Sequence, residues 1–133
     1  MISYIMMDAN NLKTINDTLG HNKGDELIIT IAKCMRKAVG HNGQCYRIGG
    51  DEFVIILKNK TAAETEEIIN KVRCEIEFAD KQSDITISVA IGYVWTDTEQ
   101  KNLEDLMQHA DDEMYQDKKK TKENKSKENT HSI

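Results

Sequence analysis

The sequence contains no apolar run that approaches the length of a membrane span, and its N-terminus lacks the basic and apolar segments of a secretory signal. It has only three cysteines, Cys34, Cys45 and Cys74, which are odd in number and widely spaced. This pattern argues against a disulfide framework or a zinc site and favours reduced thiols. Together these absences indicate a cytoplasmic protein that makes no membrane contact.

The chain also lacks an excess of positive charge. Its 18 lysine and arginine residues are outnumbered by 23 aspartate and glutamate residues, which gives a net charge of −5. An acidic protein is repelled by nucleic acids and anionic membranes, so general binding to either is not expected. With 133 residues, 38% of them hydrophobic, the chain is long enough for one domain with a core of its own.

The spacing of apolar residues predicts an α/β domain in which helices cover a sheet. Alternation with a period of two indicates strands, and apolar residues three or four apart indicate amphipathic helices. The elements are expected, in chain order, as a strand at 2–7, helices at 10–19 and 23–39, a hairpin around 47–57, a helix at 61–78, a strand at 85–95 and a helix from 103.

Three local signals refine this prediction. Gly20 is expected to cap the end of the first helix, and Thr61 with Glu64 has the spacing of a capping box at the start of the third. The second face of the strand at 85–95 carries four small residues, which would let another element pack closely against it. These residues are Thr86, Ser88, Ala90 and Gly92.

The C-terminal end differs in composition from the rest of the chain. After Lys118 the sequence consists almost entirely of lysine, glutamate, asparagine, serine and threonine. Such a segment cannot bury enough apolar surface to order itself against a core. We therefore expect a domain over residues 1–120 and a polar, disordered tail over 121–133.

The chain is organised around the stretch from Arg47 to Phe53. Two apolar-flanked runs meet there at Gly49-Gly50, which predicts a tight hairpin with positive φ angles and a backbone that a ligand can approach. Asp51 and Glu52 follow directly, and in a strand they would point to opposite faces. Carboxylates at an exposed turn suit a hard cation such as Mg²⁺. The alternative is a solvated hairpin with two surface acids.

A second group of polar residues begins where the first strand ends. If Asp8 lies beside the hairpin it can meet Asp51 at one cation, as in sites that carry out phosphoryl and nucleotidyl transfer. Lys13 could reach a phosphate. Asn16 and Asp25 combine an amide with a carboxylate, which can accept hydrogen bonds from the N–H donors of guanine.

These residues resemble the GGDEF domain, the catalytic domain of diguanylate cyclases. The signature string stands intact at 49–53, preceded by Arg47. Further matches occur in order along the chain at Asp8, Lys13, Ile15-Asn16-Asp17, Gly20-His21, Gly24-Asp25, Ser88, Ile91-Gly92, Ala110-Asp111, Met114-Tyr115 and Lys118. The resemblance covers residues 2 to about 122 and implies a ferredoxin-like nucleotidyl-cyclase palm with a central, mostly antiparallel sheet flanked by helices.

The resemblance also implies an activity, the Mg²⁺- or Mn²⁺-dependent condensation of two GTP molecules into cyclic di-GMP across a homodimer. It places Asp51 and Glu52 in catalysis, with Asp51 helping to deprotonate the attacking 3′-hydroxyl. The implied metal ligands are Asp8, the Ala9 carbonyl, Asp51 and Glu52. The implied substrate-binding residues are Lys13, Asn16, Asp25, Gly49, Gly50, Lys118 and Lys122.

The chain departs from the family pattern at several places. Gly40 and Gly43 stand where the family commonly has the Arg-x-x-Asp of an inhibitory product site, so product inhibition through that site is expected to be absent. Asn10 replaces the second acid of the first motif. The turn and helix that the family has before the first strand are missing, which implies that part of the sheet and of the nucleotide pocket is uncovered.

These departures leave three functions open. The first is a diguanylate cyclase domain, which the intact string and the guanine pair favour. The second is a catalytically weak or inactive GTP-binding regulatory module, which the truncated start and Lys122, where the family has arginine, favour. The third is a structural interaction unit, which would have no reason to keep Asp8, Asn16, Asp25 and Asp51 together.

Overall fold

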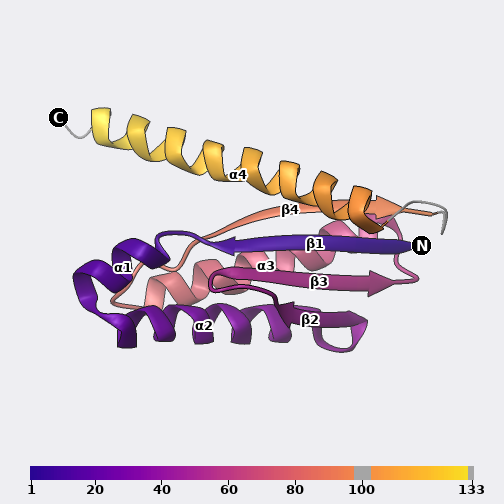
Figure 1. Ribbon diagram of the computed structural model, residues 1–133, viewed down its shortest axis with the longest axis horizontal. Helices are drawn as coiled ribbons and strands as arrows, with labels where there is room; N and C mark the ends of the chain where they lie inside the picture. The colour runs from indigo at the N-terminus through magenta and orange to yellow at the C-terminus, as the bar shows by residue number, and fades with distance from the viewer. Residues whose placement is uncertain (98–102, 132–133) are drawn as a thin grey trace.

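The computed structural model describes residues 1–97 and 103–131, with side chains for 1–97 and 104–120. The order of elements is the predicted one, and the helices cover the two faces of a single sheet (Figure 1). The elements are β1 (Ile2–Ala9), α1 (Leu12–Leu19), α2 (His21–Val39), the 3₁₀ turn η1 (Gly40–Asn42), β2 (Gly43–Arg47), β3 (Glu52–Lys58), α3 (Ala62–Gln82), β4 (Val89–Thr96) and α4 (Leu103–His131). In the described part of the chain, no helix is both long and apolar enough to span a bilayer.

The sheet has four strands in the order β2-β3-β1-β4, and every neighbouring pair is antiparallel. The predicted α/β fold with an antiparallel sheet is thus confirmed. Because β1 is central, its last residues lie between two partners. Asp8 is opposite Glu52 of β3 on one side and Ala90 of β4 on the other. The carboxyl end of β1 and the start of β3 therefore meet at one end of the sheet.

Each face of the sheet carries its own core, because alternate side chains of a strand point in opposite directions. On one face Ile5 and Met7 of β1 pack with the apolar sides of α2 and α3. On the other, Tyr4 and Met6 pack with α4, which runs along β4 and β1 (Figure 1). Asp8 follows Met6 by two residues, so its side chain lies on the α4 face.

Helix α4 approaches β4 closely enough to require glycine at position 92. A β-carbon there would overlap the backbone nitrogen of Met114 and the carbonyl oxygen of Ala110. The predicted close packing on the small-residue face is confirmed, and Ala90 on the same face is fully buried. Asp117 of α4 also accepts a hydrogen bond of 2.8 Å from the backbone N–H of Ile91. This bond fixes the helix along the edge strand.

The start of β4 differs from the prediction. The strand begins at Val89, although Ile85 and Ile87 are buried as the alternation indicated. Their backbone N–H groups donate to side chains, the Ser83 hydroxyl and the Asp80 carboxylate, and not to a neighbouring strand. The alternating pattern therefore predicted correctly which side chains are buried, but it could not show where strand pairing begins.

The capping signals are confirmed. The N–H of Glu64 donates to the Thr61 hydroxyl at 3.1 Å, while the N–H of Thr61 donates to the Glu64 carboxylate at 3.0 Å. Gly20 ends α1 with a φ of 91°. It also directly precedes α2, which begins at His21, two residues before the predicted start.

The C-terminal segment is helical where the composition indicated a disordered tail. The backbone of α4 continues without a break to His131. Lysine and glutamate are good helix formers, and no glycine or proline interrupts the segment, so nothing local ends the helix. The domain boundary near residue 120 is therefore not a boundary of secondary structure.

Candidate functional site

Asp8 is the most buried carboxylate in the polar cluster at the end of β1. Its side chain is 11% exposed, and its Oδ2 accepts a hydrogen bond of 2.8 Å from Nζ of Lys118 on α4. Burial raises the pKa of the Asp8 carboxyl, Lys118 opposes this shift by its hydrogen bond and charge, and the nearby Asp51 adds to it. Lys118, expected from sequence to hold a phosphate, thus pairs with an acid here.

The hairpin loop lies directly beside this acid. The backbone N–H of Ala9 donates to the carbonyl of Asp51 at 2.8 Å, which ties the end of β1 to the loop. Glu52 is the cross-strand partner of Asp8 on the same face. The charges of Asp8, Asp51 and Glu52 all act on Lys118. The structure therefore brings together three of the predicted acids and one predicted lysine.

The expectation that Asp51 and Glu52 point to opposite faces assumed that both residues belong to a strand. Strand β3 begins at Glu52, so Asp51 belongs to the loop and need not follow the alternation of a strand. Both carboxylates consequently act on the same ammonium group.

The hairpin is confirmed, but its turn is wider than predicted. The loop comprises residues 48–51 and closes with a bond of 3.0 Å from the N–H of Ile48 to the carbonyl of Glu52. Neither Gly49 nor Gly50 has a positive φ. Arg47 shapes the loop, because its guanidinium donates to the carbonyls of Gly49 at 3.1 Å and Gly50 at 2.7 Å. This role of Arg47 was not predicted.

Neither the backbone conformation nor the neighbouring protein atoms require glycine in this loop. A β-carbon on Gly50 would meet nothing within 4 Å, and one on Gly49 would make only ordinary contacts of 3.6 Å or more with Glu52. The absence of side chains therefore leaves space at the surface. That space lies beside the acidic cluster.

Two buried oxygens in the described region have no hydrogen-bond partner. They are Oδ1 of Asp8 and Oδ1 of Asn10. The rest of Asn10 is held firmly, because its amide donates to the Ser88 hydroxyl at 2.9 Å and its backbone N–H to the Ser88 carbonyl at 2.9 Å. A buried acceptor without a donor is costly, and a cation would satisfy it. The pairing of Asn10 with Ser88 was also not predicted.

The donors at this site fit a partly open metal site. Within the described residues, no three acid, histidine or cysteine side chains are arranged to surround an ion. Mg²⁺, however, usually takes one or two carboxylates and completes its shell with water and phosphate oxygens. Asp8 with its unpartnered oxygen, Asp51 and the adjacent Ala9 backbone match that requirement. That these three residues and Glu52 hold a metal stays a prediction.

The predicted guanine residues lie where α1 meets α2. A β-carbon on Gly24 would overlap Oδ1 of Asn16, so the Asn16 amide lies against the bare backbone of α2. Asp25 is the next residue and is exposed. Gly24 therefore lets Asn16 approach the position from which Asp25 projects. This end of the molecule also carries the end of β1 and the hairpin loop (Figure 1).

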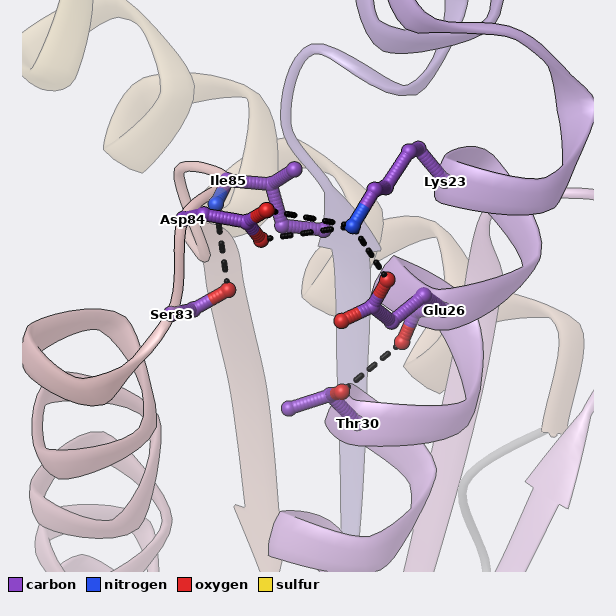
Figure 2. Close-up of polar contacts among 6 residues, drawn as sticks. All are labelled: Lys23, Glu26, Thr30, Ser83, Asp84 and Ile85. Carbon is purple, nitrogen blue, oxygen red and sulfur yellow. Dashed lines mark hydrogen bonds and ion pairs between the residues drawn. The ribbon is translucent and has the colours of Figure 1, made fainter.

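A cluster of charged residues fixes the start of α2 against the segment that precedes β4 (Figure 2). Nζ of Lys23 lies 3.1 Å from Oδ2 of Asp84 and 3.1 Å from Oε2 of Glu26. These carboxylates raise the pKa of Lys23, mainly through the hydrogen bond with Asp84. The cluster is next to Asp25 in sequence. No sequence pattern could have revealed it, because Asp84 is 61 residues away from Lys23.

The remaining residues singled out in the sequence lie outside these clusters or outside the described side chains. Lys13 is exposed in the first turn of α1. The side chain of Lys122 lies outside the described residues. Gly40 has a φ of 53°, and a β-carbon on Gly43 would lie 2.5 Å from the carbonyl oxygen of Ile56. Both positions are therefore built for glycine.

The chain matches the family model described as "Diguanylate cyclase, GGDEF domain" over residues 1–124. It is 38% identical over 120 residues to the signaling protein YkoW of Bacillus subtilis and 32% identical over 118 residues to the diguanylate cyclase DosC of Escherichia coli. These matches cover 87% and 86% of the chain but 15% and 25% of the relatives, so it spans a quarter or less of their length. The active GGEEF domain of a diguanylate cyclase from Vibrio cholerae superimposes with a TM-score of 0.79 at 27% identity, covering 90% of the chain and 77% of that domain.

Proposed function

The chain belongs to the GGDEF family of diguanylate cyclase domains, and from this premise we propose that it condenses two GTP molecules into cyclic di-GMP, with Mg²⁺ or Mn²⁺, across a homodimer. One observation carries the proposal. The acids Asp8, Asp51 and Glu52 lie together beside a loop in which neither the backbone conformation nor the neighbouring protein atoms require Gly49 and Gly50.

In this proposal each part of the cluster has a separate task. Asp8, Asp51, the Ala9 carbonyl and Glu52 hold the metal, which supplies positive charge for the attacking and leaving oxygens. Asp51, at the rim of the loop, accepts the proton of the attacking 3′-hydroxyl. Gly49 and Gly50 leave room for the nucleotide to lie close to the backbone.

The second cluster supplies recognition of the base. The carboxylate of Asp25 accepts hydrogen bonds from the N1–H and N2–H₂ groups of guanine, and the Asn16 amide binds the same edge. Adenine lacks this pair of donors, so GTP is preferred over ATP. Lys13, Lys118 and Lys122 hold the triphosphate.

The stoichiometry of the reaction requires a second copy of the chain. One subunit binds one GTP, and cyclic di-GMP contains two newly formed bonds between 3′-oxygens and α-phosphorus atoms. Two subunits that face each other bring each 3′-hydroxyl to the partner's α-phosphate. Formation of product is therefore expected to rise more steeply than linearly with protein concentration.

Replacing Gly24 with alanine tests the guanine site. The new methyl group would displace the end of the Asn16 side chain, which is flexible, so the free energy of unfolding is expected to change by no more than about 1 kcal/mol. Affinity for GTP is expected to fall by about tenfold, because one hydrogen-bonding group is lost from the base. Isothermal titration calorimetry measures the affinity. Unchanged affinity for GTP would contradict this placement of Asn16.

Replacing Gly50 with alanine tests the glycine loop. The added methyl group meets no protein atom within 4 Å, and φ at this position is not positive, so stability should equal that of the parent chain. Nucleotide binding is nevertheless expected to weaken by at least about tenfold, since the methyl group takes space that belongs to the nucleotide. Urea denaturation and calorimetry on the same preparation separate the two effects. A variant that binds GTP normally would remove the loop from the binding site.

Product inhibition through an Arg-x-x-Asp site is expected to be absent. Gly40 and Gly43 offer no guanidinium or carboxylate, and their backbone geometry does not favour a side chain at either place. Binding of cyclic di-GMP measured by calorimetry should therefore disappear in a variant that carries both Asp25→Ala and Asp51→Ala. Tight binding that survives in this variant would reveal a separate product site.

The alternative is a regulatory module that binds GTP without turning it over. The pairing of Lys118 with Asp8 favours it, because the lysine neutralises an acid that a cyclase would need for its metal. Thermal unfolding with GTP or with ATP tests binding itself. Stabilisation by GTP that ATP does not give, and that Asp25→Ala abolishes, supports guanine recognition in the cyclase and in the regulatory module alike. Equal stabilisation by the two nucleotides would contradict that recognition.

A further inference from the structure

The ammonium group of Lys118 forms an ion pair with Asp8, the most buried carboxylate of the cluster. Its Nζ is 2.8 Å from Oδ2 of Asp8, whose other oxygen is buried without a partner in the described region. Lys118 is thus the counter-ion of Asp8.

We propose that Lys118 and the metal ion exchange on Asp8, so that the lysine opposes binding of free metal and moves to the triphosphate when metal and nucleotide arrive together. This inference rests on the proposed function, because it takes the metal–nucleotide complex as the incoming ligand. It assigns one residue two successive partners, an acid of the protein and a phosphate of the substrate.

The physical basis is the sign of the charges. A free divalent ion brings only positive charge, so it must displace the ammonium from Asp8 or be repelled by it. A metal ion that carries a triphosphate brings phosphate oxygens as well, and these give the displaced ammonium a new partner. Lys118 therefore weakens the binding of free metal and strengthens the binding of the metal–nucleotide complex. The two effects have opposite signs.

The structure allows this exchange with little movement of the backbone. The lysine side chain is a flexible four-carbon stem, and that of Lys118 is 37% exposed, so one side of it faces solvent. The helix turn beneath it is fixed, because Asp117 binds the N–H of Ile91 at 2.8 Å and lies 3.6 Å from the guanidinium of Arg73. Only the side chain needs to turn from Asp8 toward the nucleotide.

Titration with Mn²⁺ alone, read by electron paramagnetic resonance, tests the first half of the exchange. Lys118→Met is expected to bind free Mn²⁺ about tenfold more tightly than the parent chain, because the competing cation is gone. Lys119→Met is the matched control. It removes the same charge from the neighbouring exposed residue of α4, which lies over the Tyr115 ring, and should leave the affinity unchanged. Adding Asp8→Asn to Lys118→Met should abolish the gain.

Titration with GTP in the presence of Mn²⁺ tests the second half. Lys118→Met is expected to bind the complex about tenfold more weakly than the parent, while Lys119→Met binds it normally. A Lys118→Met variant whose affinity for free Mn²⁺ is unchanged or lower would overturn the exchange. A parent chain that binds Mn²⁺ but not GTP would instead refute the proposed function. The affinities of the parent chain and of Lys118→Met for free Mn²⁺ would still show whether Lys118 opposes metal binding.

A measurement on the parent chain covers the case in which Lys118→Met does not fold. The ¹⁵N resonance of the Lys118 ammonium, identified by its absence in Lys118→Arg, reports the partner of this group. It is expected to shift when Mg²⁺ and GTP are added together and to stay in place with Mg²⁺ alone at the same concentration. A shift of equal size with Mg²⁺ alone would overturn the proposal.

Discussion

Replacing Asp51 with asparagine is expected to reduce the formation of cyclic di-GMP by at least about a hundredfold, without loss of stability. Asparagine keeps the shape of the side chain but can neither accept a proton in the same way nor carry the negative charge that a metal requires. The fold does not depend on this carboxylate, because the bond to Ala9 comes from the backbone carbonyl of Asp51. Product is measured by chromatography after incubation with GTP and Mg²⁺.

The same substitution is expected to change the stability of the protein very little. Asp51 raises the pKa of Asp8, which means that the two carboxylates repel each other in the folded chain. Removing the charge relieves that repulsion but also removes the attraction between Asp51 and the Lys118 ammonium, so the free energy of unfolding at pH 7 should stay within about 1 kcal/mol of the parent value. Asp97→Asn, which removes an exposed carboxylate just after β4, is the control and should change neither quantity. A marked loss of stability in Asp51→Asn would show that the carboxylate has a structural role.

Replacing Gly92 with alanine is expected to lower the free energy of unfolding by about 2 to 3 kcal/mol. The methyl group would overlap the backbone of α4 at Met114 and Ala110, and backbone atoms cannot rotate away as a side chain can. The helix must therefore move away from β4. Movement of α4 also carries Lys118 away from Asp8, so activity should fall together with stability.

Gly50→Ala is the matched control for this experiment, because its methyl group meets nothing within 4 Å. Alanine in a strand is normally more stabilising than glycine. A lower free energy of unfolding in Gly92→Ala would therefore be opposite in sign to the usual effect of this substitution. Urea denaturation of both variants measures the difference. If Gly92→Ala is as stable as the parent chain, α4 does not pack on β4 as described.

Patterns in the sequence were sufficient to predict the order of the elements and the proximity of Asp8 to the hairpin. Alternation identified the strands, the Thr61–Glu64 spacing identified a helix start, and the small face of β4 indicated close packing that the helix α4 provides at Gly92. The meeting of Asp8 with Asp51 followed from two motifs at strand ends. These predictions succeeded because each depends on residues close in sequence or on a period.

The features that sequence could not predict depend on contacts between distant segments. The bond from the Lys118 ammonium to Asp8 joins residues 110 positions apart, and the sequence offered only a basic residue near the end of a helix. Arg47 shapes the hairpin loop through its side chain, which propensities of the backbone do not describe. The start of β4 was placed too early, because burial and strand pairing both produce alternation of apolar residues.

The most direct test of the central claim is incubation of the chain at high concentration with GTP and Mg²⁺, followed by chromatography. High concentration is needed because two subunits must meet for each product molecule. Cyclic di-GMP is expected from the parent chain and from Asp97→Asn, and none above background from Asp51→Asn. Absence of product from a parent chain that GTP stabilises against unfolding would contradict the cyclase and leave a domain that binds the nucleotide without converting it.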